Sequence, residues 1–285
     1  AVERARRMLG LAATLEASLV DGQVQVRVTN ETGHKLPTGY PEGRRMWLQV
    51  RMEDEAGEEL FVSGEYLADS ALLVHDEWLR IYETKPGISH RLAAALGVEA
   101  GPSFHFALGD TIWKDNRIPP RGFDNAAFTA AQCAPVGHDY ADGQHHDLAV
   151  YSLPAGAVHA EVTLYYQSTS REYIEFLRDA NTTNDLGQQL YDAWVAQGRA
   201  APVAMAQAVA DLDATAATTP AARTVLHPAA PNPFNPMTSL TFELAQAGPA
   251  RLVIYDQAGR RIRTVASGPR PDRSRHDRPT APGDG

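Results

Sequence analysis

The stretch "QVQVRVTNETGHKLPTGYPEGRRMWLQVRME", residues 23–53, decides the fold class. Its two ends, 23–30 and 45–53, alternate apolar and polar residues with a period of two, which predicts two half-buried β-strands. The segment between them is rich in Gly and Pro, and we interpret it as the long, constrained connection of a β-hairpin. His34 lies near its start, which makes this connection the first candidate for a functional site.

Similar alternation continues along the chain. A turn and a strand are expected within residues 55–64, and further strands at 103–110, 146–153 and 158–167, the last two joined by a turn at Pro154 and Gly156. The sequence therefore predicts a mainly β fold, an antiparallel β-sandwich-like domain over residues 21–167 with flanking α-helices. The Pro- and Gly-containing segment 111–145 is expected to be a long irregular loop.

Helical periodicity flanks the β-domain. Residues 1–20 are predicted to form an N-terminal helix, because the apolar positions within 2–18 fall on one face. Residues 168–212 are predicted to be a helical segment that packs on the domain, with a third helix in the Ala-rich "PVAMAQAVADLD". The Ala- and Thr-rich residues 213–224 are expected to form a linker.

The C-terminal part has a different character. Strands are expected at 238–244, 250–255 and 261–265, whereas the tail 266–285 has no aromatic residue and no alternation, so we expect it to be disordered. "PNPFNP" (231–236), "LTFEL" (240–244) and "RLVIYDQAGRRIRTV" (251–265) resemble the start of the flagellar-hook-capping-type immunoglobulin-like module, which is akin to type IX secretion sorting domains. The resemblance implies a partial immunoglobulin-like module over 225–265 in an exported protein.

Composition limits the functional classes. The formal net charge is −9, and from Val225 onward there are 8 Lys and Arg against 5 Asp and Glu, so the rest of the chain carries about −12. An acidic body argues against binding to a nucleic-acid backbone. No run approaches the ~18 apolar residues of a membrane helix, and residues 1–20 are too charged for the apolar centre of a signal peptide. No transmembrane segment is expected.

The chain has a single cysteine, Cys133, which excludes an internal disulfide and a Cys-x-x-Cys-His haem attachment site within these residues. Cys133 could act as a nucleophile with His138, but the sequence favours a structural role, as a buried or half-buried thiol.

Three ordered segments carry a resemblance over residues 1 to about 205. They are "VTNETGHKLPTGYPEGRRMWLQV" (28–50), "SFHFALGDTIWKDNRIPPRGF" (103–123) and "YQSTSREYIEFLRDANTTNDLGQQLYDAW" (166–194). Together with the leading helix they resemble the haem-free C-terminal region of secreted bacterial multihaem c-type cytochromes. The resemblance implies haem c that is carried by an N-terminal region or by a partner cytochrome subunit and not attached to these residues.

His34 has two interpretations. Its imidazole can be a distal axial ligand to haem iron, on a loop that Gly and Pro make rigid, or it can be a loop histidine that hydrogen-bonds backbone carbonyls. Arg44 and Arg45 are candidates for cofactor binding through haem propionates, because a guanidinium matches a carboxylate bidentately. The alternatives are an ion pair with Glu42 or another ordinary salt bridge.

Two polar loops are candidates for metal sites. Residues 138–147 hold Asp139, Asp142 and His145 among other His and Asp side chains, which suit Ca²⁺ or a zinc-like ion but match no known ligand spacing, so a solvated polar loop is the alternative. The segment 114–125 offers a calcium loop through four side chains that otherwise cap their own backbone: Asp115, Asn116, Asp124 and Asn125.

These observations favour a noncatalytic structural and docking segment of an extracellular or cell-surface electron-transfer protein of the multihaem-cytochrome type. The first alternative is a module that binds carbohydrate or a surface polymer through aromatic side chains such as Trp78, Tyr82 and Trp113. The second is a metal-dependent enzyme built on residues 138–147.

Overall fold

The computed structural model describes residues 2–211, 225–226, 242–243, 248–255 and 261–270. The chain divides into two compact units, Ala1–Asp213 and Ala214–Gly285. Antiparallel strands are present in the described residues of both units, and the first unit, which carries the candidate site, also contains the helices that the structure describes. The predicted mainly β fold is confirmed.

One sheet of the first unit contains three strands in the order β1 (Ala13–Val20), β2 (Gln23–Asn30) and β11 (His146–Ser152). The turn between β1 and β2 is Asp21-Gly22, with φ values of 51° and 72°, as the two-residue turns that match the twist of a hairpin require. The predicted helix 1–20 is therefore wrong in its second half, since α1 spans Val2–Ala12. Every second residue of β1 is turned inward, a period of two that a helix cannot use.

The second sheet has the order β13 (Val203–Asp211), β12 (His159–Gln167), β3 (Arg45–Glu53) and β4 (Glu59–Ser63), and β7 (Ile81–Tyr82) also pairs with β3. Strand β13 replaces the predicted third helix. Its Ala-rich sequence favours a helix locally, but it pairs along the length of β12 and buries Met205 and Ala210. Tertiary pairing here outweighs a helix preference of only a few tenths of a kcal/mol per residue.

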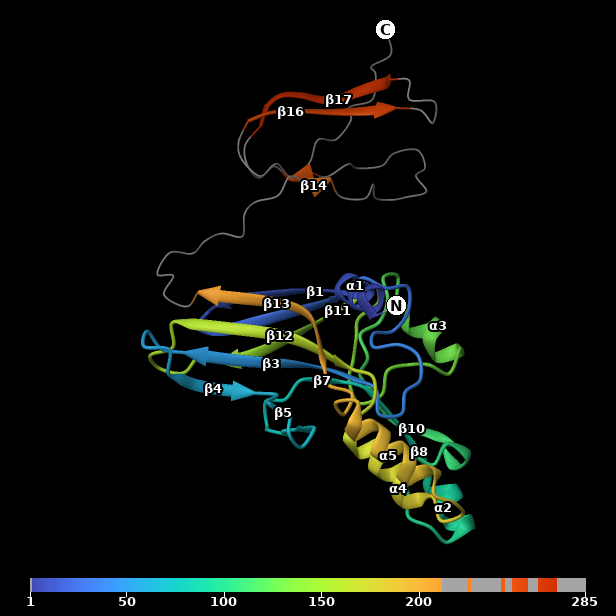
Figure 1. Ribbon diagram of the computed structural model, residues 1–285. Helices are drawn as coiled ribbons and strands as arrows, with labels where there is room; N and C mark the ends of the chain where they lie inside the picture. The colour runs from blue at the N-terminus through green and yellow to red at the C-terminus, as the bar shows by residue number, and fades with distance from the viewer. Residues whose placement is uncertain (1, 212–224, 227–241, 244–247, 256–260, 271–285) are drawn as a thin grey trace. The chain divides into compact units, whose positions relative to one another are not determined.

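The two sheets pack face to face and enclose the main core, and the layers are visible in Figure 1. Strands β1 and β13 lie side by side, which brings the two sheets together along one edge. The core side chains come alternately from both sheets, and among them are Val24, Val26, Val28, Met46, Leu48, Val50, Met52, Ala160, Val162 and Leu164. This is the sandwich-like arrangement predicted from the sequence.

Strands β2 and β3 belong to different sheets, so the segment 31–44 is not a hairpin connection. It carries the chain from one layer of the sandwich to the other. The sheets of a sandwich are about 10 Å apart, and this explains why the connection is long. The turn at Pro154 and Gly156 likewise joins β11 and β12 across the two sheets.

The outer face of the second sheet is covered by a second cluster around Trp47, Leu73 and Ile81. Helices α4 (Arg171–Ala180) and α5 (Leu186–Ala196) pack beside it through Ile174 and Trp194, close to the short strands β5 (Tyr66–Leu67) and β6 (Leu72–Leu73). Helix α4 begins at the N-cap Ser170, whose side chain accepts a hydrogen bond from the Tyr173 amide. Both helices agree with the sequence prediction.

A small sheet extends from the sandwich at the end where the site lies. Its order is β10 (Thr111–Asp115), β8 (Thr84–Ile88) and β9 (Gly101–Pro102), and the elements around it are α2 (His90–Leu96), the 3-10 helix η1 (Phe106–Leu108) and α3 (Asn125–Ala130). The predicted strand 103–110 is wrong, because these residues contain the 3-10 helix η1 and no strand. The segment 111–145 contains β10 and α3 and is not irregular throughout.

The second unit contains β14 (Val225–Leu226) paired with β15 (Phe242–Glu243), and β16 (Gly248–Tyr255) paired with β17 (Arg261–Arg270). Strand β17 passes the predicted end at residue 265, so the expectation of disorder is wrong for 266–270. The linker 213–224, the "PNPFNP" motif and residues 271–285 lie outside the described residues.

Candidate functional site

The buried side chain of Asn30 fixes the first part of the 31–44 crossover. Its Nδ2 donates to the backbone carbonyl oxygens of His34, Ile118 and Pro119 at 2.8–2.9 Å. Its Oδ1 accepts from the amide nitrogen and the hydroxyl of Thr32. Because Asn30 ends β2 and is 1 % exposed, these bonds attach the loop to the sandwich and to the 118–119 segment.

His34 is exposed on this anchored loop. Its Nδ1 lies 3.1 Å from Thr32 Oγ1, whose proton is directed to Asn30 Oδ1 at 2.7 Å. The same hydroxyl also lies 2.9 Å from the His34 carbonyl oxygen. When its proton goes to either oxygen, the hydroxyl can accept from Nδ1–H, and in that tautomer Nε2 carries the lone pair. A hydrogen bond at one ring nitrogen in this way prepares the other for a metal ion.

A buried cluster of charged side chains, Lys35, Asp115 and Arg117, holds the same loop in place. Lys35 Nζ donates to Asp115 Oδ2 at 2.7 Å and to the Cys133 carbonyl oxygen at 2.6 Å, and Arg117 binds the same carboxylate with Nε and Nη2 at 2.8 Å. Burial would raise the pKa of Asp115, but Arg117 and Lys35 hold it below its usual value. Cys133 is exposed and not buried as predicted, because its backbone is held by Lys35 while its side chain points outward.

The second part of the crossover carries the two predicted arginines. Arg44 Nη1 donates to the Thr38 carbonyl oxygen at 2.5 Å and packs against Gly39, where a Cβ would collide with it. Arg45 has a side chain that is only 5 % exposed. Its Nε donates to Gln167 Oε1 at 2.9 Å, whereas Nη1 lies 3.4 Å from both carboxylate oxygens of Glu172.

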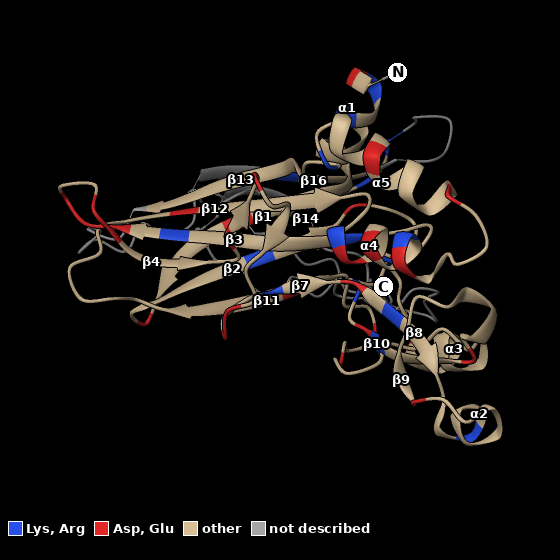
Figure 2. Ribbon diagram, turned by 60° about the horizontal axis from the view of Figure 1, so that its bottom comes forward, with Lys and Arg blue, Asp and Glu red and all other residues tan. Residues whose placement is uncertain are grey.

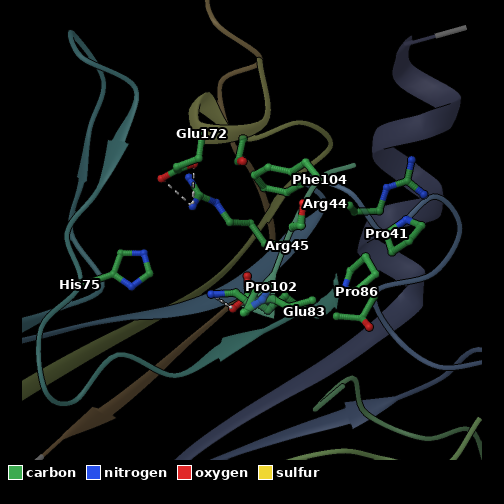
Figure 3. Close-up of a pocket in the computed structure, with 14 residues that line it drawn as sticks. Pro41, Arg44, Arg45, His75, Glu83, Pro86, Pro102, Phe104 and Glu172 are labelled. Carbon is green, nitrogen blue, oxygen red and sulfur yellow. Dashed lines mark hydrogen bonds and ion pairs between the residues drawn. The ribbon is translucent and has the colours of Figure 1, made fainter. Parts of the chain in front are cut away.

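Arg44 and Arg45 line a cavity of about 330 Å³ between the start of α4, β8 and β9 (Figure 3). Its apolar wall consists of Pro41, Pro86, Pro102 and Phe104. The polar groups come from five separate parts of the chain: Arg44, Arg45, His75, Glu83, Thr84, Lys85, Ser103, Ser170 and Glu172. His34, the predicted iron ligand, is not among the residues that line this cavity.

Charge in the cavity is arranged around Arg45. Burial would raise the pKa of Glu172, but the Arg45 guanidinium and hydrogen bonds at the start of α4 lower it, so the carboxyl is ionised. Figure 2 shows basic and acidic residues together on α4, whereas the turn between β3 and β4 carries acidic residues. Glu42 is buried, and within the described residues its Oε2 has no hydrogen-bond partner. The alternative pair with Glu42 is therefore replaced by a pair of Arg45 with Glu172.

The predicted metal loop 138–147 has its polar groups engaged elsewhere. Asp142 accepts from the amide nitrogen and Nδ2 of Asn125, His145 Nδ1 lies 3.2 Å from the Gly143 carbonyl oxygen, and Asp139 is exposed. Across the described part of the chain, no three His, Cys, Asp or Glu side chains are grouped as a metal ion needs. Asp139, Asp142 and His145 are thus not brought together.

The buried acid of this region is Asp147, which is 2 % exposed. It accepts from Arg80 Nε and Nη2 at 2.7 and 2.8 Å and from the Tyr82 hydroxyl at 2.9 Å, and His138 Nε2 lies at 3.2 Å. Burial would raise the pKa of Asp147, but hydrogen bonds from His138 and Arg80 and the charge of Arg80 bring it well below its usual value. This cluster fastens β11 to the β7 region.

The four predicted calcium ligands in 114–125 bind other groups of the protein, which agrees with the alternative that they are structural. Asp115 is occupied by two cations, Asn116 bonds the Glu83 amide nitrogen and the Ile81 carbonyl oxygen, and Asp124 is the N-cap of α3. Asn125 donates to the Tyr140 carbonyl oxygen and to Asp142.

The aromatic side chains of the carbohydrate alternative are placed differently from one another. Trp78 is 43 % exposed, Trp113 is half-buried, and Tyr82 is 1 % exposed, with its hydroxyl bonded to Asp147. Tyr82 therefore cannot stack on a sugar, and the site would reduce to separate tryptophans.

Comparison with known proteins gives little. No protein-family model matches the sequence, and no curated protein does either. A solved structure, the penta-heme cytochrome c552 from Thermochromatium tepidum, is similar at 17 % identity with a TM-score of 0.43. The match covers 72 % of this chain and 40 % of that one. In the described residues, no helix is long and apolar enough to cross a membrane.

Proposed function

We propose that this chain is a noncatalytic structural and docking segment of an extracellular electron-transfer protein of the multihaem-cytochrome type. The haem is carried by an N-terminal region or by a partner, and His34 is its distal ligand. The observation that carries the proposal is that His34 is exposed on an anchored loop, with Nδ1 3.1 Å from Thr32 Oγ1, which leaves Nε2 as the ring nitrogen for a metal ion.

The loop suits such a ligand because it is ordered before any partner arrives. Asn30 Nδ2 donates to the His34 carbonyl oxygen, and Leu36 exchanges two backbone hydrogen bonds of 2.9 Å with Ile118. Both chain neighbours of the buried Lys35 are therefore held in place. A ligand on a loop that is already ordered loses less conformational entropy on binding. An imidazole nitrogen is also one of the common axial ligands of haem iron. The ordered sequence motifs at 28–50, 103–123 and 166–194 support the same class.

The test is a titration of the purified chain with a haem peptide that has one open axial position. We expect the Soret band to shift to that of six-coordinate haem, and we expect His34→Ala to abolish the shift. His105→Ala is the matched control, because His105 is also exposed and lies on a different loop. A spectrum that is the same for wild type and His34→Ala would refute the assignment of His34.

We also propose Arg44 and Arg45 as candidates for binding haem propionates, because a guanidinium matches a carboxylate bidentately. Their cavity is not lined by His34, so contact with the same haem is a separate question. Mesoporphyrin and its dimethyl ester distinguish the two cases, since only the free diacid can pair with a guanidinium.

A further inference from the structure

The cavity contains a buried cationic group with an unused donor. Arg45 Nη2 is buried and has no hydrogen-bond partner among the described residues. The side chain as a whole is only 5 % exposed. A buried donor without a partner costs about 1–3 kcal/mol, and more when it is charged. The pair with Glu172 does not relieve this, because both of its contacts are to Nη1 at 3.4 Å, longer than the ~2.7–2.9 Å of a good charged hydrogen bond.

The surroundings of Arg45 favour an added negative charge. The other acid of the cavity, Glu83, is already paired with Lys85 at 3.1 Å and with Lys114 at 2.9 Å. Arg44 contributes a second guanidinium, whose Nε is also buried without a partner in the described residues. Helix α4 begins at Ser170 on the cavity wall and directs its positive end there.

The rest of the cavity is apolar and of limited size. The Phe104 ring packs on Tyr173 and Phe176, with centroid distances of 5.1 and 5.6 Å respectively, and these contacts fix its position. Pro86 and Pro102 form the facing surface on β8 and β9. A volume of about 330 Å³ is at the small end of the range for small-molecule sites.

We infer that the cavity binds a small organic monocarboxylate with a flat apolar body. Its carboxylate accepts from Arg45 Nη1 in place of Glu172, which turns toward solvent, and from Nη2 once the guanidinium rotates to present both groups as a bidentate pair. The body of the ligand lies between Phe104 and the prolines. Figure 3 shows Phe104 and Glu172 on the two sides of the Arg45 guanidinium. The inference uses none of the geometry of His34 and is independent of the proposed function.

The experiment is a titration of the full chain with benzoate, followed by the arginine side-chain signals in NMR and by calorimetry. We expect saturable one-to-one binding of benzoate and at least about tenfold weaker binding of benzamide, its neutral isostere, since a charged hydrogen bond is worth a factor of this size. Acetate should also bind more weakly, because it lacks the body that meets Phe104.

Variants then locate the site. Arg45→Lys should weaken benzoate about tenfold, because an ammonium cannot form the bidentate pair. Glu172→Gln should tighten it several-fold by removing the competing carboxylate, and this variant keeps the assay decisive if Arg45→Lys fails to fold. Arg178→Lys in the last turn of α4, outside the cavity lining, is the matched control and should leave the affinity unchanged. His34→Ala should also leave it unchanged.

Equal binding of benzoate and benzamide, or an unchanged affinity in Glu172→Gln, would overturn the inference. Absence of benzoate binding together with Arg45-dependent binding of mesoporphyrin would overturn it as well. That last result would assign the arginines to porphyrin propionates instead.

Discussion

Replacement of Asn30 tests how the 31–44 crossover is held. Asn30 makes five hydrogen bonds, three to carbonyl oxygens and two from Thr32, and all of them are lost in Asn30→Ala. A net contribution of about 0.5–1.5 kcal/mol per bond, reduced because two N–H groups serve three carbonyls, gives about 2–4 kcal/mol of destabilisation. Asn30→Asp should cost about 1–3 kcal/mol more than Asn30→Ala, since it places a carboxylate against those same carbonyl oxygens.

The assay is urea unfolding followed by tryptophan fluorescence. All four tryptophans lie within residues 1–211, so the signal reports on the first unit alone. Asn181→Ala is the matched control: the Asn181 side chain makes four hydrogen bonds in a turn, but these bonds are exposed, and water replaces them at a cost of less than about 1 kcal/mol. A loss below about 1 kcal/mol for Asn30→Ala, or equal losses for Ala and Asp, would refute the reasoning.

Two further perturbations follow from the described contacts. Asp147→Asn should destabilise the first unit by about 2–4 kcal/mol at pH 7, because it leaves Arg80 partly buried without its carboxylate. The pKa of Asp147 is lowered by folding, so its stabilising contribution is present above the unfolded pKa of about 4 and is lost as the pH falls toward the folded value. Urea midpoints of wild type and variant should thus converge in acid, and a constant difference would contradict this account. Gly87→Ala should cost about 1–3 kcal/mol, because its Cβ would overlap the backbone of β9, whereas Gly33→Ala, with nothing within 4 Å of the added carbon, should change the urea midpoint little.

The sequence predicted the elements whose pattern is local and strong. Strands β2, β3, β11 and β12 alternate with a period of two, and α4 has an N-cap serine followed by an amphipathic face, so the sequence identifies both kinds of element. Strand β1 was missed because "ATLEASLV" fits either period, although the Asp21-Gly22 pair after it is a hairpin signal that identifies it. Strand β13 offers no such signal, since only its pairing with β12 makes an Ala-rich segment extended.

The candidate site was predictable in part, for the same physical reason. His34, Arg44 and Arg45 lie in one unusual run, and the sequence singles them out together. Phe104 and Glu172 are brought to Arg45 from segments 59 and 127 positions away, and no local pattern connects them. Asn30 resembled an ordinary turn residue, because its role depends on the carbonyl oxygens of Ile118 and Pro119, which are distant in the sequence.

The crossover between the sheets has an evolutionary consequence. Its first half is tied to the 115–119 segment and its second half to the start of α4, where the Ser170 amide donates to the Gly43 carbonyl oxygen at 2.7 Å. The separation of His34 from Arg45 is therefore determined by the thickness of the packed core and not by the number of residues that join them. A change of side-chain volume at Val28 or Leu48 should therefore alter this spacing in evolution, whereas a substitution of the exposed Thr38 side chain should not.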